Sequence, residues 1–248
     1  MGHRTSSLVQ VADAIVTFVQ GVYHEQVHIN LYAFKVTPPI LTLWLEIESL
    51  SRYQSVPPVA VVKMRQVPPS GFEMYNVNAI NSSGTGTDTQ ALALTAEGQK
   101  LVYKFCLFSS YQDTILIKAL PAYFYGCRVK GAVDFIFGSG TAWFDTSNIV
   151  VEAPKRYATV TAHQRTPGGN TIFVFNKCEV LPFNAQTPPN LVYLDRPWSP
   201  YAAVTFQSSF LSNIVNPLGW IPWSGGPVTG NEHATYQEFG NYGPGSPT

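Results

Sequence analysis

The chain has 248 residues, of which 45% are hydrophobic and only 12% are charged, and its 15 Lys and Arg balance its 15 Asp and Glu. A chain of this length and apolar content can bury one sizeable core, so we expect a single domain over residues 1–248. The even, sparse charge argues against a nucleic-acid partner, and no apolar run reaches the about 20 residues of a membrane-spanning helix, so we expect no membrane contact.

The first seventy residues contain one helical pattern and a stretch that fits a sheet poorly. Ser7 to Ile15 is the only convincing helical segment, and no secretory signal is visible before or within it. Residues 24–28 read HEQVH, a zinc-protease motif, but its neighbours favour a strand, in which the two His lie about 13 Å apart and cannot share a metal. Residues 30–70 contain Pro-Pro pairs at 38, 57 and 68. Because proline removes donors from a sheet, we predict that residues 30–70 are irregular or incomplete.

From Phe72 onwards one pattern recurs in short β-prone segments. An aromatic residue is followed three positions later by a small or polar residue, and two positions after that by an aliphatic or aromatic one. The copies are Phe72/Tyr75/Val77, Tyr103/Cys106/Phe108, Phe124/Cys127/Val129, Phe144/Ser147/Ile149, Phe175/Cys178/Val180 and Phe206/Ser209/Leu211. A unit of about 21 residues, sometimes lengthened by a loop of about ten, is typical of a solenoid of stacked coils. A β-sandwich also has regularly spaced strands, but six in-register copies favour the solenoid.

Cysteines and a glycosylation sequon give weaker indications. Three cysteines are too few for a disulfide framework. The repeat puts Cys106 and Cys127 on adjacent coils, where a disulfide fits, although two buried thiols fit better. The Asn81-Ser82-Ser83 sequon, the low charge and the many aromatic residues are typical of a secreted protein.

The carboxylates after residue 100 are the best candidates for chemistry. Gln90, Gln112 and Asp134 lie 22 residues apart in turn, so a solenoid of that period would stack them in a column, with Asp113 beside it. Two carboxylates and two amides supply a nucleophile or base, a proton donor and oxyanion stabilisers. An amide ladder without catalytic role is the alternative. Gln112 and Asp113 can serve one site only if the chain bends there, because neighbours in a strand point to opposite faces.

Six segments together resemble the pectin methylesterase family. In chain order they are GVYHEQV at 21–27, QALAL at 90–94, YQDT at 111–114, GAVDFIFG at 131–138, LDRPW at 194–198 and GWIPW at 219–223. The resemblance implies an all-β fold, a single-stranded right-handed parallel β-helix with a short N-terminal helix. It also implies a secreted, monomeric esterase that binds pectin, the methyl-esterified homogalacturonan, and releases methanol with no cofactor and no metal.

The matching motifs imply a role for each polar residue. Asp134 would be the nucleophile that forms a covalent intermediate, and Asp113 the general acid and then base. Gln112 and Gln90 would stabilise the oxyanion. Arg196 would lie within hydrogen-bond reach of Asp134 and keep it ionised, while Asp113 retains a proton.

The same resemblance implies substrate-binding aromatic residues, and the chain departs from the family at several places, one of them next to Arg196. Trp198 would pack against the sugar, with Phe135 and Trp223 as further substrate-binding residues. Asp195 stands where the family usually has glycine, which gives Arg196 a second possible partner. Activity could suffer from that competition.

Two other classes of function compete with the esterase. A non-catalytic or degenerate β-helix that binds cell-wall polysaccharide is favoured by the unusual amino-terminal third. A polysaccharide hydrolase or lyase needs carboxylates at a set separation or a Ca²⁺ ion held by clustered acids, and no clustered acids accompany Asp113 and Asp134.

Overall fold

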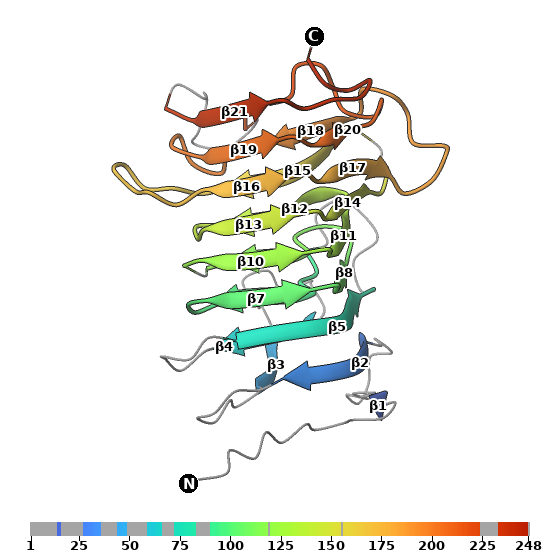
Figure 1. Cartoon of the computed structure of the whole chain (residues 1–248), viewed down its shortest axis with the longest axis vertical. Coiled ribbons are helices and arrows are strands. Elements are labelled where there is room, and N and C mark those ends of the chain that lie inside the picture. Colours follow the sequence, from blue (N-terminus) through green and yellow to red (C-terminus); the bar gives the residue numbers. More distant parts are fainter. Residues whose placement is uncertain are drawn as a thin grey trace, which may run out of the picture.

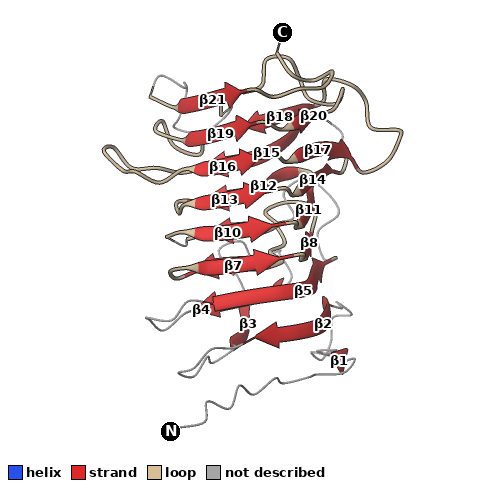
Figure 2. Ribbon diagram, in the orientation of Figure 1, coloured by secondary structure: helices blue, strands red, loops and turns tan. Residues whose placement is uncertain are grey.

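The structure is a computed structural model that describes residues 14–15, 27–35, 44–48, 59–65, 72–82, 90–118, 120–154, 156–223 and 233–247. For the strands before residue 73 it describes the backbone pairing. All regular structure in these ranges is β-strand, with no helix among them (Figure 2). The strands stack one above another as the coils of a parallel β-helix (Figure 1).

Two sheets wrap the same core. The larger contains, in spatial order, β20 (Phe210–Leu211), β17 (Glu179–Pro182), β14 (Asn148–Val151), β11 (Arg128–Gly131), β8 (Leu107–Ser109), β5 (Phe72–Asn81), β7 (Leu101–Lys104), β10 (Ala122–Tyr125), β13 (Ala142–Asp145), β16 (Phe173–Asn176), β19 (Ala203–Gln207) and β21 (Thr235–Phe239), with β2 (Val27–Lys35) and β1 (Ala14–Ile15) attached through β5. The smaller contains β18 (Val192–Asp195), β15 (Ala158–His163), β12 (Val133–Gly138), β9 (Ile115–Ile117), β6 (Leu94–Glu97), β4 (Val59–Arg65) and β3 (Trp44–Glu48). Strand β5 pairs with β7 along its first part and with β8 along its second, so the larger sheet has two arms that meet at a corner.

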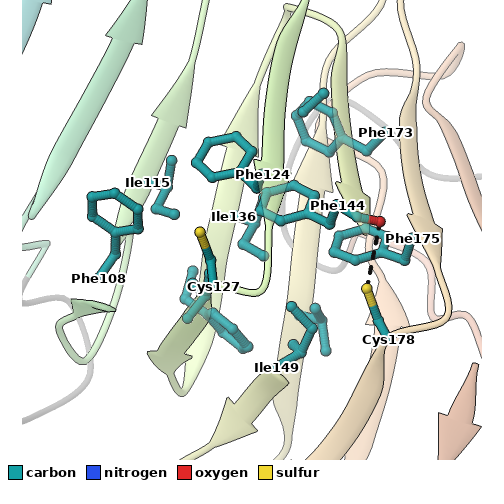
Figure 3. Close-up of a cluster of buried hydrophobic side chains, with 14 of the residues drawn as sticks. Phe108, Ile115, Phe124, Cys127, Ile136, Phe144, Ile149, Phe173, Phe175 and Cys178 are labelled. Carbon is teal, nitrogen blue, oxygen red and sulfur yellow. Dashed lines mark hydrogen bonds between the residues drawn. The ribbon is translucent and has the colours of Figure 1, made fainter. Parts of the chain in front are cut away.

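The sequence repeat is confirmed as the register of the larger sheet. The aromatic positions pair directly across neighbouring strands and stack as near-parallel rings, whose centroids lie 4.6, 4.4, 4.8 and 4.2 Å apart along the series Tyr103, Phe124, Phe144, Phe175 and Phe206. Figure 3 shows part of this ladder with the aliphatic positions beneath it. Each ring is fully buried, so every coil covers the apolar face of the next.

The first copy of the repeat is the exception. Met74, and not Phe72, pairs with Tyr103, and Met74 is buried whereas Tyr75 is 46% exposed. The predicted register of this coil is therefore wrong by two residues. The reason is that Asn76, at φ 54°, makes the left-handed corner that Phe105 makes in the next coil, and this fixes which residues before it point inward.

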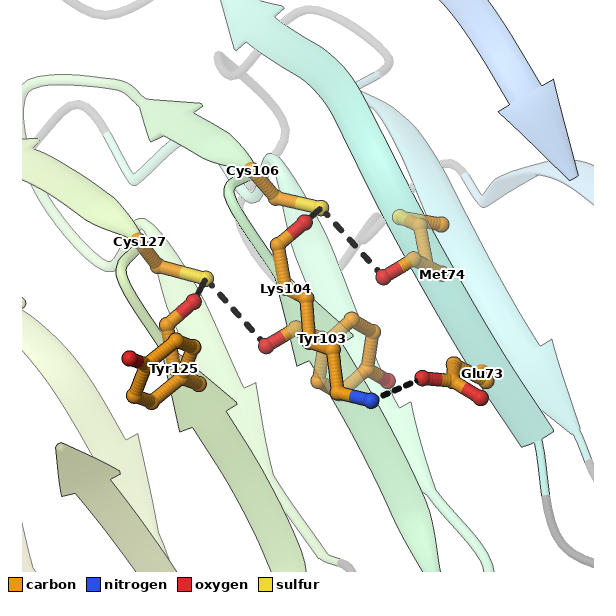
Figure 4. Close-up of polar contacts among 7 residues, drawn as sticks. All are labelled: Glu73, Met74, Tyr103, Lys104, Cys106, Tyr125 and Cys127. Atoms are coloured by element: carbon orange, nitrogen blue, oxygen red, sulfur yellow. Dashed lines mark hydrogen bonds and ion pairs between the residues drawn. The ribbon is translucent and has the colours of Figure 1, made fainter.

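The cysteines are buried thiols. Cys106, Cys127 and Cys178 are all free and lie on the core face next to the aromatic ladder. The Cys127 thiol donates to the carbonyl oxygen of Tyr103 at 3.4 Å, and Cys106 has the equivalent contacts one coil earlier (Figure 4). The favoured interpretation of two buried thiols holds in this structure.

Two amino-terminal predictions concern segments of which the structure describes only a part. Ala14–Ile15 pairs antiparallel with β2, so the helix expected over Ser7 to Ile15 does not reach Ile15, and its earlier residues lie outside the described ranges. Of the HEQVH motif, the last two residues belong to strand β2 and the rest lies outside the described ranges.

Residues 30–70 do not follow the coil pattern of the later chain. Where the structure describes them, β2 pairs antiparallel with β5 and β3 pairs antiparallel with β4, whereas β4 is parallel to β6. The other residues of this segment lie outside the described ranges, so the irregularity predicted from its prolines stays a prediction.

The glycosylation sequon is not accessible in the folded chain. Asn81 is only 3% exposed, and its side-chain amide donates to the carbonyl oxygen of Leu92 at 2.8 Å. Because this nitrogen is buried, the folded chain leaves no room for a glycan on it, and the sequon gives no support for secretion.

Candidate active site

A kink in strand β12 presents the central carboxylate. Val133 pairs with Thr159 and Ile136 pairs with Thr161, so the register shifts within the strand. Asp134 lies at this shift with φ 48°, a left-handed conformation that is costly for a non-glycine residue and accumulates at functional sites. The strand ends at Gly138, at φ 126°, where an added Cβ would lie 2.2 Å from the carbonyl oxygen of Ile117.

The predicted polar column is correct for two of its three members. Gln90 and Gln112 pair across adjacent coils, but the next partner of Gln112 is Val133 and not Asp134. The offset from Gln112 to its partner is therefore 21 residues rather than the assumed 22. As a result Asp134 is level with Asp113.

The bend that the site requires is present at Asp113. This residue has φ 59°, the same left-handed conformation as Asp134 one coil later. Both aspartates therefore leave the alternation of a regular strand, which would have directed Asp113 and Gln112 to opposite faces. The two carboxylates and the Gln112 amide can consequently face the same side of the smaller sheet.

Arg196 holds Asp134 from the end of strand β18. Its Nε donates to Oδ1 of Asp134 at 2.7 Å, and its Nη2 pairs with Oδ2, so the ion pair is bidentate. The side chains are 16% and 6% exposed, which shields the pair from water. The contact expected between residues 62 positions apart is present.

A threonine completes the support of this carboxylate. The hydroxyl of Thr159 donates to Oδ1 of Asp134 at 2.6 Å and accepts the backbone N–H of Asp134 at 2.9 Å. With Arg196, these bonds fix the orientation of the carboxylate.

Asp113 has the opposite electrostatic environment. Burial raises its pKa well above the ordinary value of 3.8, the negative charge of Asp134 raises it further, and the smaller effect of the Arg196 charge acts in the opposite direction. Neighbouring carboxylates that differ in this way can take different roles, one as a charged nucleophile and the other as a proton donor.

Aromatic side chains border the aspartates, but not all of those predicted. Trp198 is 39% exposed and lies 5.9 Å, centroid to centroid, from Phe137. Trp223 lies under the guanidinium of Arg196, 4.2 Å from its ring centroid. Phe135 is fully buried in the main core, so its prediction as a substrate-binding residue is wrong. The kink at the preceding residue turns it inward, and Phe137 takes the outer position.

Asp195 does not compete for Arg196. Its carboxylate is fully buried and accepts hydrogen bonds from Thr161, the backbone of His163 and Tyr236. Among the described residues the ion pair of Arg196 is with Asp134. The expected competition is therefore wrong, because residue 195 points into the helix interior while residue 196 points out.

The described part of the chain has no group of three or more His, Cys, Asp or Glu placed to hold a metal ion. Nor does it contain a helix that is long and apolar enough to span a membrane.

Comparison with known proteins identifies the family. The family model described as Pectinesterase matches residues 59–248. The chain belongs to the pectinesterase family. A relative named "Probable pectinesterase A" from Aspergillus fumigatus is 35% identical over 254 aligned positions, which cover 96% of this chain and 72% of that protein.

Solved pectin methylesterases share the fold of this pectinesterase-family chain. The enzyme from Aspergillus niger, in deglycosylated form, is 36% identical with a TM-score of 0.63, over 71% of this chain and 56% of that one. The pectin methylesterase from carrot is 28% identical with a TM-score of 0.59, over 68% of this chain and 55% of that one. The chain thus spans little more than half the length of these structures.

The sequence reasoning missed three residues around this pectinesterase-family site. Thr159 supports Asp134, Phe137 contacts the exposed tryptophan, and Tyr157 lies close to Arg196. Thr159 was detectable only through the register of strand β15 on β12, which the bulge alters. Phe137 was visible in the motif at 131–138, but only the kink decides that it, and not Phe135, faces outward.

Proposed function

We propose that this chain hydrolyses the methyl esters of homogalacturonan to free carboxylates and methanol, outside the cell, through a covalent intermediate on Asp134. One observation carries the proposal: a shielded, Arg-paired Asp134 lies one coil from Asp113, whose pKa is raised. The names of the family and of its relatives support the same substrate.

In the first half of the reaction, a carboxylate oxygen of Asp134 attacks the carbonyl carbon of the methyl ester. The carbonyl oxygen becomes a tetrahedral oxyanion, and the side-chain amides of Gln112 and Gln90 donate hydrogen bonds to it. The bond from carbon to the methoxy oxygen then breaks. Asp113 gives its proton to that oxygen, methanol leaves, and the galacturonyl group remains joined to Asp134 as an anhydride.

In the second half, water hydrolyses this anhydride. Asp113, now ionised, takes a proton from the water while the hydroxide oxygen adds to the acyl carbon. The bond to Asp134 breaks, the product leaves as a carboxylic acid that gives its remaining proton to the solvent, and both aspartates return to their starting protonation. Arg196 pairs with the Asp134 carboxylate at the start and end of this cycle, in which Asp134 is first the nucleophile and then the leaving group.

Rings around the site suit a pyranose. Trp198 offers an exposed face, Phe137 packs beside it, and Trp223 borders Arg196. Apolar sugar faces stack on such rings, which would orient the ester over Asp134.

Methanol release from methyl-esterified pectin by the purified chain tests the proposal. The variant Asp134→Asn should lower the rate by at least about 10³-fold, because it removes the attacking carboxylate while retaining its shape. The matched control is Asp145→Asn, an equivalent change on strand β13 of the other sheet, where the carboxylate bonds Tyr123 and Asn176. This control should retain activity.

Two results would contradict the proposal. If Asp134→Asn kept more than a tenth of the rate, the nucleophile would be another residue. If the wild-type chain bound pectin but released no methanol, the chain would be a polysaccharide-binding β-helix instead.

A further inference from the structure

Asp195 is a buried ionisable residue that has no role in the proposed reaction. It is the last residue of strand β18 and is fully buried. Its Oδ1 accepts hydrogen bonds from the hydroxyl of Thr161 and, at 3.2 Å, from the backbone N–H of His163. Its Oδ2 accepts from the phenol of Tyr236 at 2.7 Å. One side chain therefore joins strands β15, β18 and β21.

Strand β15 connects this side chain to the nucleophile. Thr159 and Thr161 both belong to this strand and are separated by the single residue Val160. Thr159 bonds Asp134 on one neighbouring strand, and Thr161 bonds Asp195 on the other. Because Arg196 follows Asp195 directly and pairs with Asp134, the contacts close into a ring across β12, β15 and β18.

At Arg196 a backbone hydrogen bond joins the chain of this ring to strand β15. The chain leaves the strand at this residue, and its amide donates to the carbonyl oxygen of Thr161 at 3.2 Å, the upper end of the usual range. The carboxylate of Asp195 accepts a hydrogen bond from the hydroxyl of the same residue, Thr161. A shift of β18 along β15 would therefore move the Arg196 guanidinium away from Asp134.

We propose that Asp195 is a positioning residue that fixes the end of strand β18 on strand β15 and thereby holds Arg196 in its bidentate pair with Asp134. The inference rests on the proposed function for its kinetic consequence only. The hydrogen bonds that Asp195 accepts indicate how substitutions at this position should act. Asparagine keeps an oxygen for Thr161 and His163 and turns its amide to Tyr236, whose oxygen can accept. Alanine leaves the backbone N–H of His163 and the phenol of Tyr236 buried without this acceptor, while the Thr161 hydroxyl keeps only the carbonyl oxygen of Leu194 at 2.9 Å.

Kinetics on methyl-esterified pectin form the first test. Asp195→Ala should lower kcat by about 10- to 100-fold with little change in KM, because a displacement of about 1 Å at a reacting group costs this much. Asp195→Asn should restore most of kcat. The control, Ser147→Ala, also removes buried hydrogen bonds, to Cys127 and Asp145, but on the other sheet. It should lower stability and leave kcat unchanged.

A double-mutant cycle identifies the route of the effect. In an Arg196→Ala background, Asp195→Ala should cause less than a twofold further loss of kcat, because the group that it positions is gone. If Asp195→Ala does not fold, Thr161→Val removes one donor at constant volume and should lower kcat severalfold. Additive losses in the cycle, or a wild-type kcat in Asp195→Ala or Thr161→Val, would overturn the proposal.

An NMR measurement separates this inference from the proposed function. The Nε–H resonance of Arg196, assigned by its loss in Arg196→Ala, should be distinct and slowly exchanging in the wild type because it is bonded to a shielded carboxylate. Asp195→Ala should shift or broaden it, whereas Asp195→Asn and Ser147→Ala should not. Should the wild type release no methanol, the proposed function fails while this resonance still decides the positioning role. An unchanged resonance in Asp195→Ala refutes that role.

Discussion

Replacing Asp195 by asparagine should change how stability depends on pH. Burial raises the pKa of Asp195 from 3.8 to about 7, although hydrogen bonds from Thr161, Tyr236 and His163 act in the opposite direction. The folded state therefore binds a proton more tightly than the unfolded state, and the wild type loses stability as pH rises from about 4 to about 7. Three pKa units at about 1.4 kcal/mol each give a loss of about 4 kcal/mol, an upper value.

Asparagine cannot ionise, so Asp195→Asn should lack this loss. Urea unfolding of both proteins at pH 4.5 and pH 8 measures this loss. The quantity compared is the difference in free energy of unfolding between variant and wild type at each pH. We expect the free energy of unfolding of the variant, relative to the wild type, to rise by about 2–4 kcal/mol between these pH values. Other titrating groups, Asp113 and Glu238 among them, cancel because both proteins contain them. An equal pH dependence in both proteins would show that Asp195 is ionised throughout the range and would refute the reasoning.

The remaining predictions concern the core, the proton donor and the amino-terminal segment. Phe144→Ala removes a fully buried ring from the middle of the aromatic ladder and should lower the free energy of unfolding by about 3–5 kcal/mol in urea titrations, and a loss below about 1 kcal/mol would contradict the ladder's role. Since Asp113 must be protonated to release methanol, the rate should fall as pH rises through its raised pKa, and Asp113→Asn should lower kcat at every pH; a rate that stays flat from pH 5 to pH 9 would argue against this donor. Limited proteolysis should cut within residues 30–70 before it cuts beyond Phe72, because the three Pro-Pro pairs there interrupt sheet pairing, and equal resistance throughout would contradict this.

Strand stacking was predictable from the sequence because its cause is local and repeated. Each coil must place an aromatic residue inside at one position, so the residues at 103, 124, 144, 175 and 206 reveal the register without knowledge of any contact. The same logic failed at the first coil, where Met74 replaces the aromatic residue and an exposed Tyr75 sits beside it.

The candidate site was predictable as a set of residues, but its geometry was not. The motifs at 111–114, 131–138 and 194–198 contain the aspartates and the arginine. Nothing in them indicates that both Asp113 and Asp134 are left-handed, and that backbone choice decides which neighbours share a face. A one-residue shift moves a side chain from outside to inside, and this is why Phe135 is buried and Phe137 is not.

The sequence by itself determined which side chains this protein has available and the period on which they repeat, because apolar burial in stacked coils leaves a pattern in the chain. Only the tertiary structure decided that Arg196 meets Asp134 while its neighbour Asp195 turns inward to Thr161 and Tyr236. Contacts between residues some 30 to 60 positions apart depend on the register of strands β12, β15 and β18. That register depends on the bulge in strand β12. The free-energy cost of its left-handed backbone is offset by the packing of the whole coil, and not by the residues that form the bulge.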